Sequence, residues 1–144
     1  MSASLAVLVV IALVGATLLT GWLLRRRDGR ARAVRDVDVR PLLVDPGARG
    51  ERATLVQFST DMCARCPQVR RTLAAIAAQS DGVRFAEIDL THRPDLAQRL
   101  HILQTPTVFV LDRDAFVRTR FTGVPAAPAV TAALHRVTGD AARV

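Results

Sequence analysis

Cys63 and Cys66 are the only cysteines in the chain, and two residues separate them. Thiol–disulfide exchange proceeds by attack of a thiolate on a disulfide sulfur, so a second thiol nearby can complete the exchange that the first begins. Side chains three positions apart lie on the same side of a helical turn, which lets the two sulfur atoms reach bonding distance. We therefore expect Cys63 to attack a disulfide and Cys66 to resolve the mixed disulfide.

The residues around the pair predict a strand, a loop and a helix. The apolar run 55–58 is typical of a short buried strand, and residues 59–62 interrupt it. Apolar residues then recur at helical spacing, at Val69, Leu73, Ile76 and Ala77. The cysteines fall at the junction of loop and helix, where free backbone N–H groups and the helix dipole favour a thiolate. Arg65 adds a positive charge between the two sulfurs.

Other uses of the two cysteines stay open at this stage. A zinc site needs four ligands, and the three histidines of the chain lack the spacing that would complete one. An inert disulfide is a second alternative. A soft-metal (copper) binding or delivery module is a third, although Met62 is one residue away from the Met-x-Cys-x-x-Cys of copper chaperones. The last is a non-catalytic membrane-tethered adaptor whose cysteines are incidental.

Two further motifs follow the cysteine pair along the chain. Gln104-Thr105-Pro106-Thr107 leads into the apolar run 108–111, and Thr122-Gly123 follows another short strand-like segment. Together with Cys63-Ala64-Arg65-Cys66, these motifs resemble the thioredoxin family over residues 55–137. The resemblance implies an α/β fold, a mixed sheet with helices on both faces.

The same resemblance implies a substrate groove beside the reactive sulfur. Met62, Thr105, Pro106 and Gly123 would line it, the Thr105–Pro106 peptide bond would be cis, and the backbone of Thr105 would pair with an extended substrate strand. No cofactor is expected apart from the redox-active Cys63–Cys66 disulfide, and no metal.

The sequence also departs from the family pattern at the site. Gln57 stands where the family usually has a buried acid that helps to move the proton of the second thiol. Phe85 stands where a lysine often partners that acid, and Met62 replaces a frequent tryptophan. Because the acid and its partner are both missing, water or Cys63 itself would have to serve as the base for Cys66.

The first part of the chain predicts a membrane anchor. Residues 5–24 carry no charge over a length that spans about 30 Å as a helix, which matches a bilayer core. Trp22 suits the interface, and Arg25 to Arg27 end the segment. A cleaved signal peptide or a buried core helix would also be apolar, but residues 1–4 lack the basic side chain that usually precedes a signal sequence. We expect membrane lipid as a partner of this segment.

An arginine-rich segment follows the anchor. Residues 25–52 hold nine arginines and five acidic residues, a net charge of +4, and prolines and glycines punctuate them. We interpret the segment as a juxtamembrane linker, with 37–44 either part of it or an element of the domain. Flanking arginines favour the cytoplasmic side for the domain of this single-pass cell-membrane protein, with the extracytoplasmic side as the alternative.

The net charge of +7 is weak evidence for a nucleic-acid partner, and we expect none. All 20 basic residues are arginine, while lysine, asparagine and tyrosine are absent, a composition that indicates a GC-rich coding bias.

The remaining pattern completes the expected organisation. It predicts a strand over 83–90, a short helix over 95–100, a hairpin around Asp112-Arg113-Asp114 and a final helix ended by Gly139. The expected divisions are an anchor (1–24), a linker (25–52) and a thioredoxin-like domain (53–144).

The function expected from these features is that of a membrane-anchored thiol–disulfide oxidoreductase, active in disulfide reduction, electron relay or cell redox homeostasis. Its partners would be a protein or small-molecule disulfide or dithiol substrate and a thiol system that donates or accepts electrons.

Overall fold

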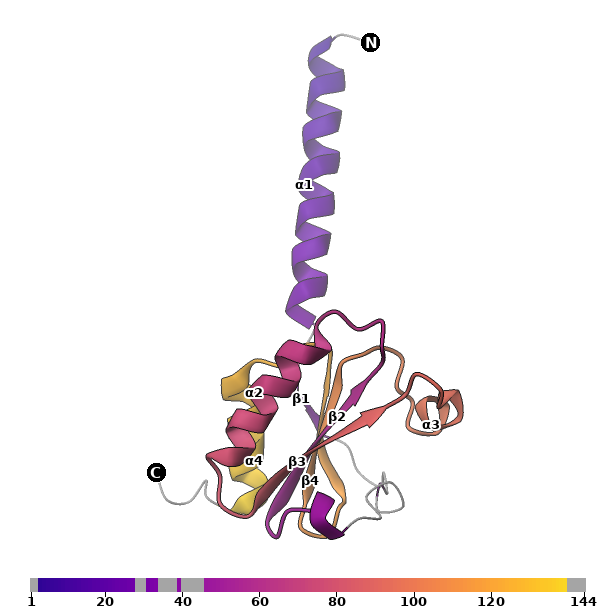
Figure 1. Ribbon diagram of the computed structural model, residues 1–144. Helices are drawn as coiled ribbons and strands as arrows, with labels where there is room; N and C mark the ends of the chain where they lie inside the picture. The colour runs from indigo at the N-terminus through magenta and orange to yellow at the C-terminus, as the bar shows by residue number, and fades with distance from the viewer. Residues whose placement is uncertain (1–2, 28–30, 34–38, 40–45, 140–144) are drawn as a thin grey trace.

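The computed structural model describes residues 3–27, 31–33, 39 and 46–139 (Figure 1). In chain order the elements are α1 (Ala3–Arg27), β1 (Ala31–Ala33), the 3₁₀ helix η2 (Pro46–Ala48), β2 (Ala53–Ser59), α2 (Cys66–Ala78), β3 (Val83–Asp89), α3 (Pro94–Arg99), β4 (Thr107–Asp112), β5 (Val117–Thr122) and α4 (Ala127–Thr138).

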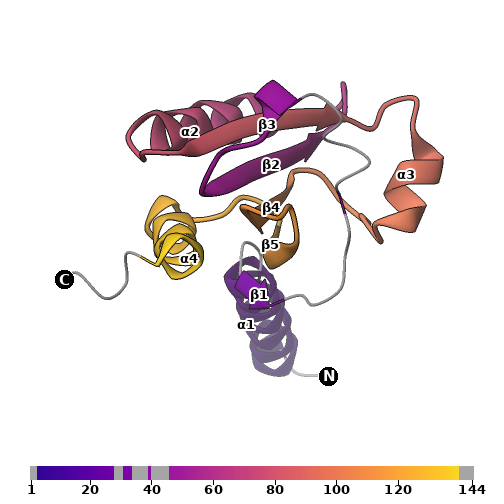
Figure 2. The same ribbon diagram turned by 90° about the horizontal axis from the view of Figure 1, so that it is seen from below.

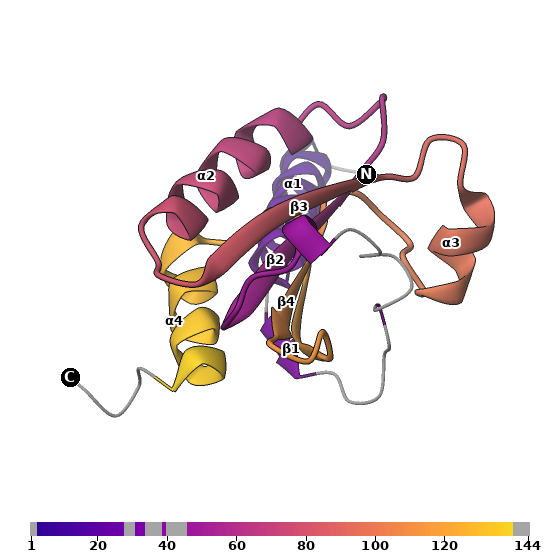
Figure 3. The same ribbon diagram turned by 60° about the horizontal axis from the view of Figure 1, so that its bottom comes forward.

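The strands form one mixed sheet in the order β1-β5-β4-β2-β3. β2 and β3 run parallel and are joined through α2, while the other neighbouring pairs are antiparallel. α2 and α4 lie side by side on one face of the sheet, and α3 lies on the other (Figures 2 and 3). The predicted mixed α/β sheet with helices on both faces is therefore confirmed.

Alternating residues of the central strands supply two separate cores, because successive side chains of a strand point to opposite faces. Leu55 of β2 packs with Val69 and Leu73 of α2 and with residues of α4. Val56 and Phe58 face the other way and pack in the cluster that contains Leu96 and Leu100. Gln57 has the parity of Leu55, so the strand directs it towards α2.

The ends of the helices follow the sequence signals. Proline occupies the first turn of α2, α3 and α4, where its missing N–H costs no helical hydrogen bond. Gly139 ends α4 in the left-handed conformation with φ of 77°.

The hairpin between β4 and β5 forms around Asp112, whose Oδ1 accepts hydrogen bonds from the backbone N–H groups of Asp114 and Phe116.

α1 extends away from the sheet in Figure 1, and its stretch Ser4–Leu23 is long and apolar enough to cross a membrane. Every side chain from 4 to 23 is exposed, so α1 does not pack as a core helix. A signal sequence would share this length and composition.

Parts of the predicted linker contact the domain. β1 pairs with β5 as an edge strand, with Ala31 opposite Phe121, and Val39 is buried at 1% exposure in the core with α3. Gly50 lies so close to its neighbours that a Cβ would come 2.0 Å from the Ala53 carbonyl oxygen. β1 and Gly50 therefore depart from the linker interpretation, and Val39 fits the alternative in which 37–44 belongs to the domain. The other residues of 37–44 lie outside the described residues.

Candidate functional site

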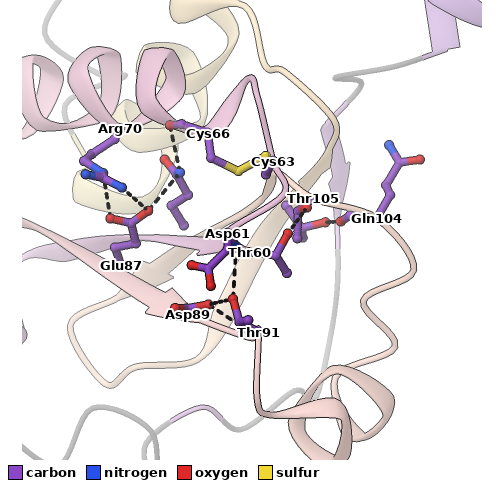
Figure 4. Close-up of a disulfide and its surroundings, with 12 residues drawn as sticks. Thr60, Asp61, Cys63, Cys66, Arg70, Glu87, Asp89, Thr91, Gln104 and Thr105 are labelled. Atoms are coloured by element: carbon purple, nitrogen blue, oxygen red, sulfur yellow. Dashed lines mark hydrogen bonds and ion pairs between the residues drawn. A yellow bond between two sulfur atoms is a disulfide. The ribbon is translucent and has the colours of Figure 1, made fainter.

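A disulfide joins Cys63 and Cys66, with the two Cα atoms 5.4 Å apart (Figure 4). Cys66 is the first residue of α2 and is buried at 2% exposure, whereas Cys63 lies in the preceding turn and is only partly buried. The Cys63 N–H donates to the Thr60 carbonyl at 3.0 Å, and the Cys66 N–H donates to the Cys63 carbonyl at 3.2 Å. The pair therefore lies at the expected junction, with Cys63 in the turn and Cys66 in the helix.

The N-terminus of α2 approaches the disulfide without a side-chain cap. Arg65 holds the cap position, and its side chain is exposed and makes no capping hydrogen bond. Helical N–H groups of the first turn lack intrahelical partners, so this end of α2 carries a partial positive charge. A partial positive charge of this kind favours a thiolate over a thiol at an adjacent cysteine.

The loop before β4 meets the cysteine loop from the other side. The Thr105–Pro106 bond is cis, as predicted, and the hydroxyl of Thr105 lies 3.1 Å from that of Thr60. Gly123 has a φ of 86° and donates its N–H to the Pro106 carbonyl at 2.8 Å. The structure thus gathers Thr105, Pro106 and Gly123 into one corner of the site.

Two large apolar side chains near this corner project into solvent. Met62, directly before Cys63, is 94% exposed, and Leu103 is 93% exposed. The sequence predicts Met62 at the site but not Leu103, because an isolated leucine in a loop has no periodicity that marks it as exposed.

Gln57 lies under Cys66 on the sheet. Its side chain has 0% exposure, and Nε2 donates to the Cys66 carbonyl at 3.0 Å and to Oε1 of Glu87 at 3.3 Å. Both neighbours are acceptors, so the amide nitrogen must face them and the amide oxygen must point away. Within the described residues, that oxygen, Oε1, is buried without a hydrogen-bond partner.

Glu87 and Arg70 form an ion pair beside Gln57 that the sequence analysis missed. The Nε of Arg70 lies 2.7 Å from Oε2 of Glu87, and its Nη2 donates to Oε1 at 3.1 Å. Two signals could have found the pair. Parallel pairing of β2 with β3 sets Glu87 opposite Gln57, and Arg70 follows Cys66 by four positions, on the same side of α2.

An open pocket of about 380 Å³ lies alongside the disulfide. It is lined by Ser59, Thr60, Asp61, Cys63, Cys66, Pro67, Arg70, Glu87 and Asp89. A hydrogen bond from the Thr91 hydroxyl, followed by one from the Thr91 backbone, lowers the pKa of Asp89. The same hydroxyl accepts a hydrogen bond from the Asp61 N–H at 3.0 Å, which ties the cysteine loop to the end of β3.

Metal ligands are not grouped at this site. Among residues 3–27, 31–33, 39 and 46–139, no group of three or more histidine, cysteine or acidic side chains is arranged to hold a metal ion. His92, His101 and His135 are exposed.

The thioredoxin family model matches residues 48–135, which is more than half of the chain. The chain belongs to the thioredoxin family. The match begins before the predicted boundary at residue 53 and includes Gly50, which packs tightly against the first residues of β2.

Curated relatives include the human and rat proteins named thioredoxin domain-containing protein 8. The human protein is 33% identical over 60 residues, which cover 42% of this chain and 47% of that protein. The rat protein is 31% identical over 61 residues. The chain thus spans about half the length of the curated relatives it matches.

Solved structures of thioredoxins share the fold. Chloroplastic thioredoxin z has a TM-score of 0.58 at 24% identity, covering 75% of this chain and 96% of that one. A thioredoxin mutant from Halobacterium salinarum has a TM-score of 0.58 at 20% identity, covering 71% and 88%. A thioredoxin fold with a close cysteine pair supports thiol–disulfide oxidoreductase chemistry in general; thioredoxins need no cofactor.

Proposed function

We propose that the protein is a membrane-anchored thiol–disulfide oxidoreductase in which Cys63 attacks and Cys66 resolves. The observation that carries the proposal is the unequal burial of two bonded cysteines in a thioredoxin fold. Cys63 is the more accessible sulfur, at the end of the sheet where the turn meets α2, while Cys66 is almost fully buried. A substrate can therefore reach Cys63 and not Cys66.

The reaction follows from this order. The Cys63 thiolate attacks one sulfur of a substrate disulfide, the S–S bond of the substrate breaks, and a mixed disulfide forms. Cys66 then loses its proton and attacks Cys63, which forms the Cys63–Cys66 disulfide and releases the second substrate thiol. The reverse sequence oxidises a dithiol, and a separate thiol system returns the pair to its starting state.

The groove beside Cys63 would hold an extended substrate segment. Thr105 lies next to the cysteine loop through its contact with Thr60, and its backbone would pair with a passing strand. Exposed Met62 would contact apolar side chains of that segment, and Pro106 and Gly123 would shape the floor. Arg65 would tune the Cys63 thiolate.

Reduction of insulin by the full chain in a mild detergent tests this function. With a dithiol donor in excess, the wild-type protein should accelerate the precipitation of insulin chains, and the C63S/C66S double variant should not. Equal rates from the two proteins would refute the proposal, provided that both retain the same far-UV circular dichroism.

The apolar helix supports a membrane anchor. Ser4–Leu23 is exposed along its length and has the composition of a span, and the basic residues after it favour N-terminus out and domain in. On that side the protein would act as a reductant or electron relay beside the bilayer. Fusions after Val144 test the orientation: fluorescence from a reporter that matures only in the cytoplasm supports it, and activity of fused alkaline phosphatase contradicts it.

A further inference from the structure

Gln57 stands where the thioredoxin family usually has a buried acid, so the strand beneath Cys66 offers its thiol no base. A carboxamide does not take up a proton near neutral pH, so Gln57 cannot receive the one that Cys66 releases. We propose that Glu87 accepts this proton when Cys66 resolves the mixed disulfide, with Gln57 and Arg70 as positioning residues. The inference rests on the proposed function and names a residue for its second step.

Among the carboxylates that line the pocket, Glu87 is the one that the Gln57 amide connects to Cys66. Asp61, Glu87 and Asp89 all line the pocket that the two cysteines share. Asp89 is held by Thr91 at the end of β3, and Asp61 is exposed in the loop. Glu87 is partly buried and shares with Cys66 the hydrogen bonds of a single amide, that of Gln57.

The shared amide fixes where the carboxylate lies. Gln57 Nε2 faces the Cys66 carbonyl and Oε1 of Glu87 at the same time, and its full burial leaves it no alternative position. Arg70 holds Glu87 from the opposite side through both carboxylate oxygens. Figure 4 shows the Glu87 carboxylate below Arg70, with contacts to Arg70 and to the amide that also reaches the Cys66 carbonyl.

Charged and polar groups face Glu87 from each element around it. Arg70 faces it from α2, neutral Gln57 faces it from β2, Asp61 lies in the loop between them, and Asp89 lies two positions along β3. A carboxylate accepts a proton on either oxygen, and Gln57 and Arg70 hold the two oxygens of Glu87 beside the pocket. The negative charge of Glu87 opposes a free Cys66 thiolate, which favours proton transfer during the attack rather than before it.

The step balances as follows. The S–H bond of Cys66 breaks and its proton passes through the pocket to Glu87, while the Cys66 sulfur forms a bond with the Cys63 sulfur. The bond between Cys63 and the substrate sulfur breaks, and the substrate leaves as a thiolate. That thiolate or the solvent then takes the proton from Glu87, so no additional oxidant or reductant is consumed.

Reaction of the reduced full chain with the chromogenic disulfide DTNB in a mild detergent separates the two steps. Attack by Cys63 releases one thionitrobenzoate, and resolution by Cys66 releases a second. We expect E87Q to retain the first phase and to slow the second by about 10- to 100-fold, at or below the lower end of the usual range for general acid–base catalysis. E87D should recover part of the second-phase rate.

Whether E87Q slows or accelerates the second phase distinguishes proton transfer from a simple charge effect. If Glu87 acted only through its charge, its removal would favour the Cys66 thiolate and E87Q would resolve faster than the wild type. D89N is the matched comparison, because it removes a carboxylate from the same pocket without touching Gln57; its second phase should equal or slightly exceed that of the wild type. In R70Q, the second phase should slow while the first phase keeps the wild-type rate, because Glu87 loses the ion pair that holds its carboxylate in place.

Three results would overturn the inference: an E87Q second phase at or above the wild-type rate, an E87D rate no higher than that of E87Q, or slowing by D89N equal to that by E87Q. Absence of the first phase in the wild-type protein would instead refute the proposed function. Far-UV circular dichroism of E87Q that matches the wild type shows that the variant is folded.

Discussion

The side-chain hydroxyls of Thr60 and Thr105 lie 3.1 Å apart and share a hydrogen bond across 45 positions of sequence. Thr60 belongs to the loop that leads from β2 to Cys63, and Thr105 precedes the cis bond at Pro106. This contact joins the two loops that form the proposed groove. It holds the loop that leads to Cys63 against the loop that contains Thr105.

A double-mutant cycle measures that contact. T60V and T105V should each destabilise the full chain by about 1 kcal/mol, the usual net contribution of one hydrogen bond. The double variant should lose less than the sum of the two, since both single variants remove the same bond. Urea unfolding in a mild detergent supplies the free energies. Additive losses would show that the two hydroxyls do not stabilise one another.

A carboxyl introduced at position 57, beside Cys66, should destabilise the protein as the pH rises. In Q57E the introduced carboxyl would face the Cys66 carbonyl and the Glu87 carboxylate, both of which are acceptors. Burial and the neighbouring negative charge would raise its pKa above the unfolded value of about 4.3. An acid with a raised pKa leaves stability intact below the unfolded pKa and removes it above.

The stability deficit of Q57E should therefore be small near pH 4 and grow by up to about 1.4 kcal/mol per pH unit above that. Urea unfolding at a series of pH values measures it. Q57L is the control, because it removes the amide without adding a titrating group, and its deficit should not grow with pH. Parallel curves for the two variants would contradict the placement of Gln57 against Glu87.

Arg120 should stabilise the segment that leads into the groove. Its guanidinium lies 5.4 Å from the centre of the Phe109 ring and donates to the carbonyls of Leu100 and His101. Burial, and then the charge of Arg32, lowers the pKa of Arg120, but arginine stays charged at ordinary pH. R120M keeps the apolar stem and loses the donors, so we expect a loss of about 2 kcal/mol and faster amide exchange over 101–105.

Arg118 provides the comparison for that variant. Its side chain is 56% exposed and pairs with the largely buried carboxylate of Asp112, and an ion pair that solvent reaches from one side contributes about 1 kcal/mol. R118M should therefore cost less than R120M and leave exchange over 101–105 unchanged. An equal effect of the two variants would show that Arg120 does not hold this segment.

Thr91 should control the titration of Asp89. Its hydroxyl and N–H both donate to the carboxylate and lower the pKa of Asp89 below its usual value of 3.8. T91V removes the hydroxyl, the larger cause, so the pKa should rise towards 3.8. A carboxyl whose pKa is lowered by folding stabilises the protein above its unfolded pKa, and this stabilisation is lost as the pH falls through the folded pKa. In T91V the free energy of unfolding should therefore decrease less as the pH falls.

Carbon-detected NMR titration of the Asp89 carboxyl checks the shift directly. T131V is the control, because Thr131 donates its hydroxyl to the Ala127 carbonyl on α4, away from Asp89. An Asp89 pKa that is the same in T91V and in the wild type would assign the lowering to another group.

The sequence predicts those parts of the site that rest on local pattern. The Cys63-Cys66 spacing, the helix after it and the Thr105-Pro106 motif each occupy a few consecutive residues, and the structure places them as expected. The ion pair of Glu87 with Arg70 is different. It depends on the register of β2 against β3 and on the rotation of α2, and neither can be predicted from one segment of the sequence alone.

The edge of the sheet escaped prediction for a related reason. β1 is three exposed residues, Ala31–Ala33, with no apolar alternation, so nothing in the segment marks it as a strand. Its partners lie in β5, far along the chain, and pairing at that separation comes from the tertiary fold. In the sequence, Gly50 is typical of a linker. Only the structure shows the backbone packing that excludes a Cβ at this position.

The central claim is that Cys63 begins disulfide exchange and Cys66 completes it, and trapping of the mixed disulfide tests this most directly. The reduced full chain and its C63S and C66S variants are incubated with glutathione disulfide at neutral pH in a mild detergent, and intact masses are followed over time with site mapping. C66S should accumulate one glutathione on Cys63, the wild type should pass to the internal disulfide with little adduct, and C63S should react slowly. Faster accumulation of the adduct on Cys66 in C63S than on Cys63 in C66S would contradict the account.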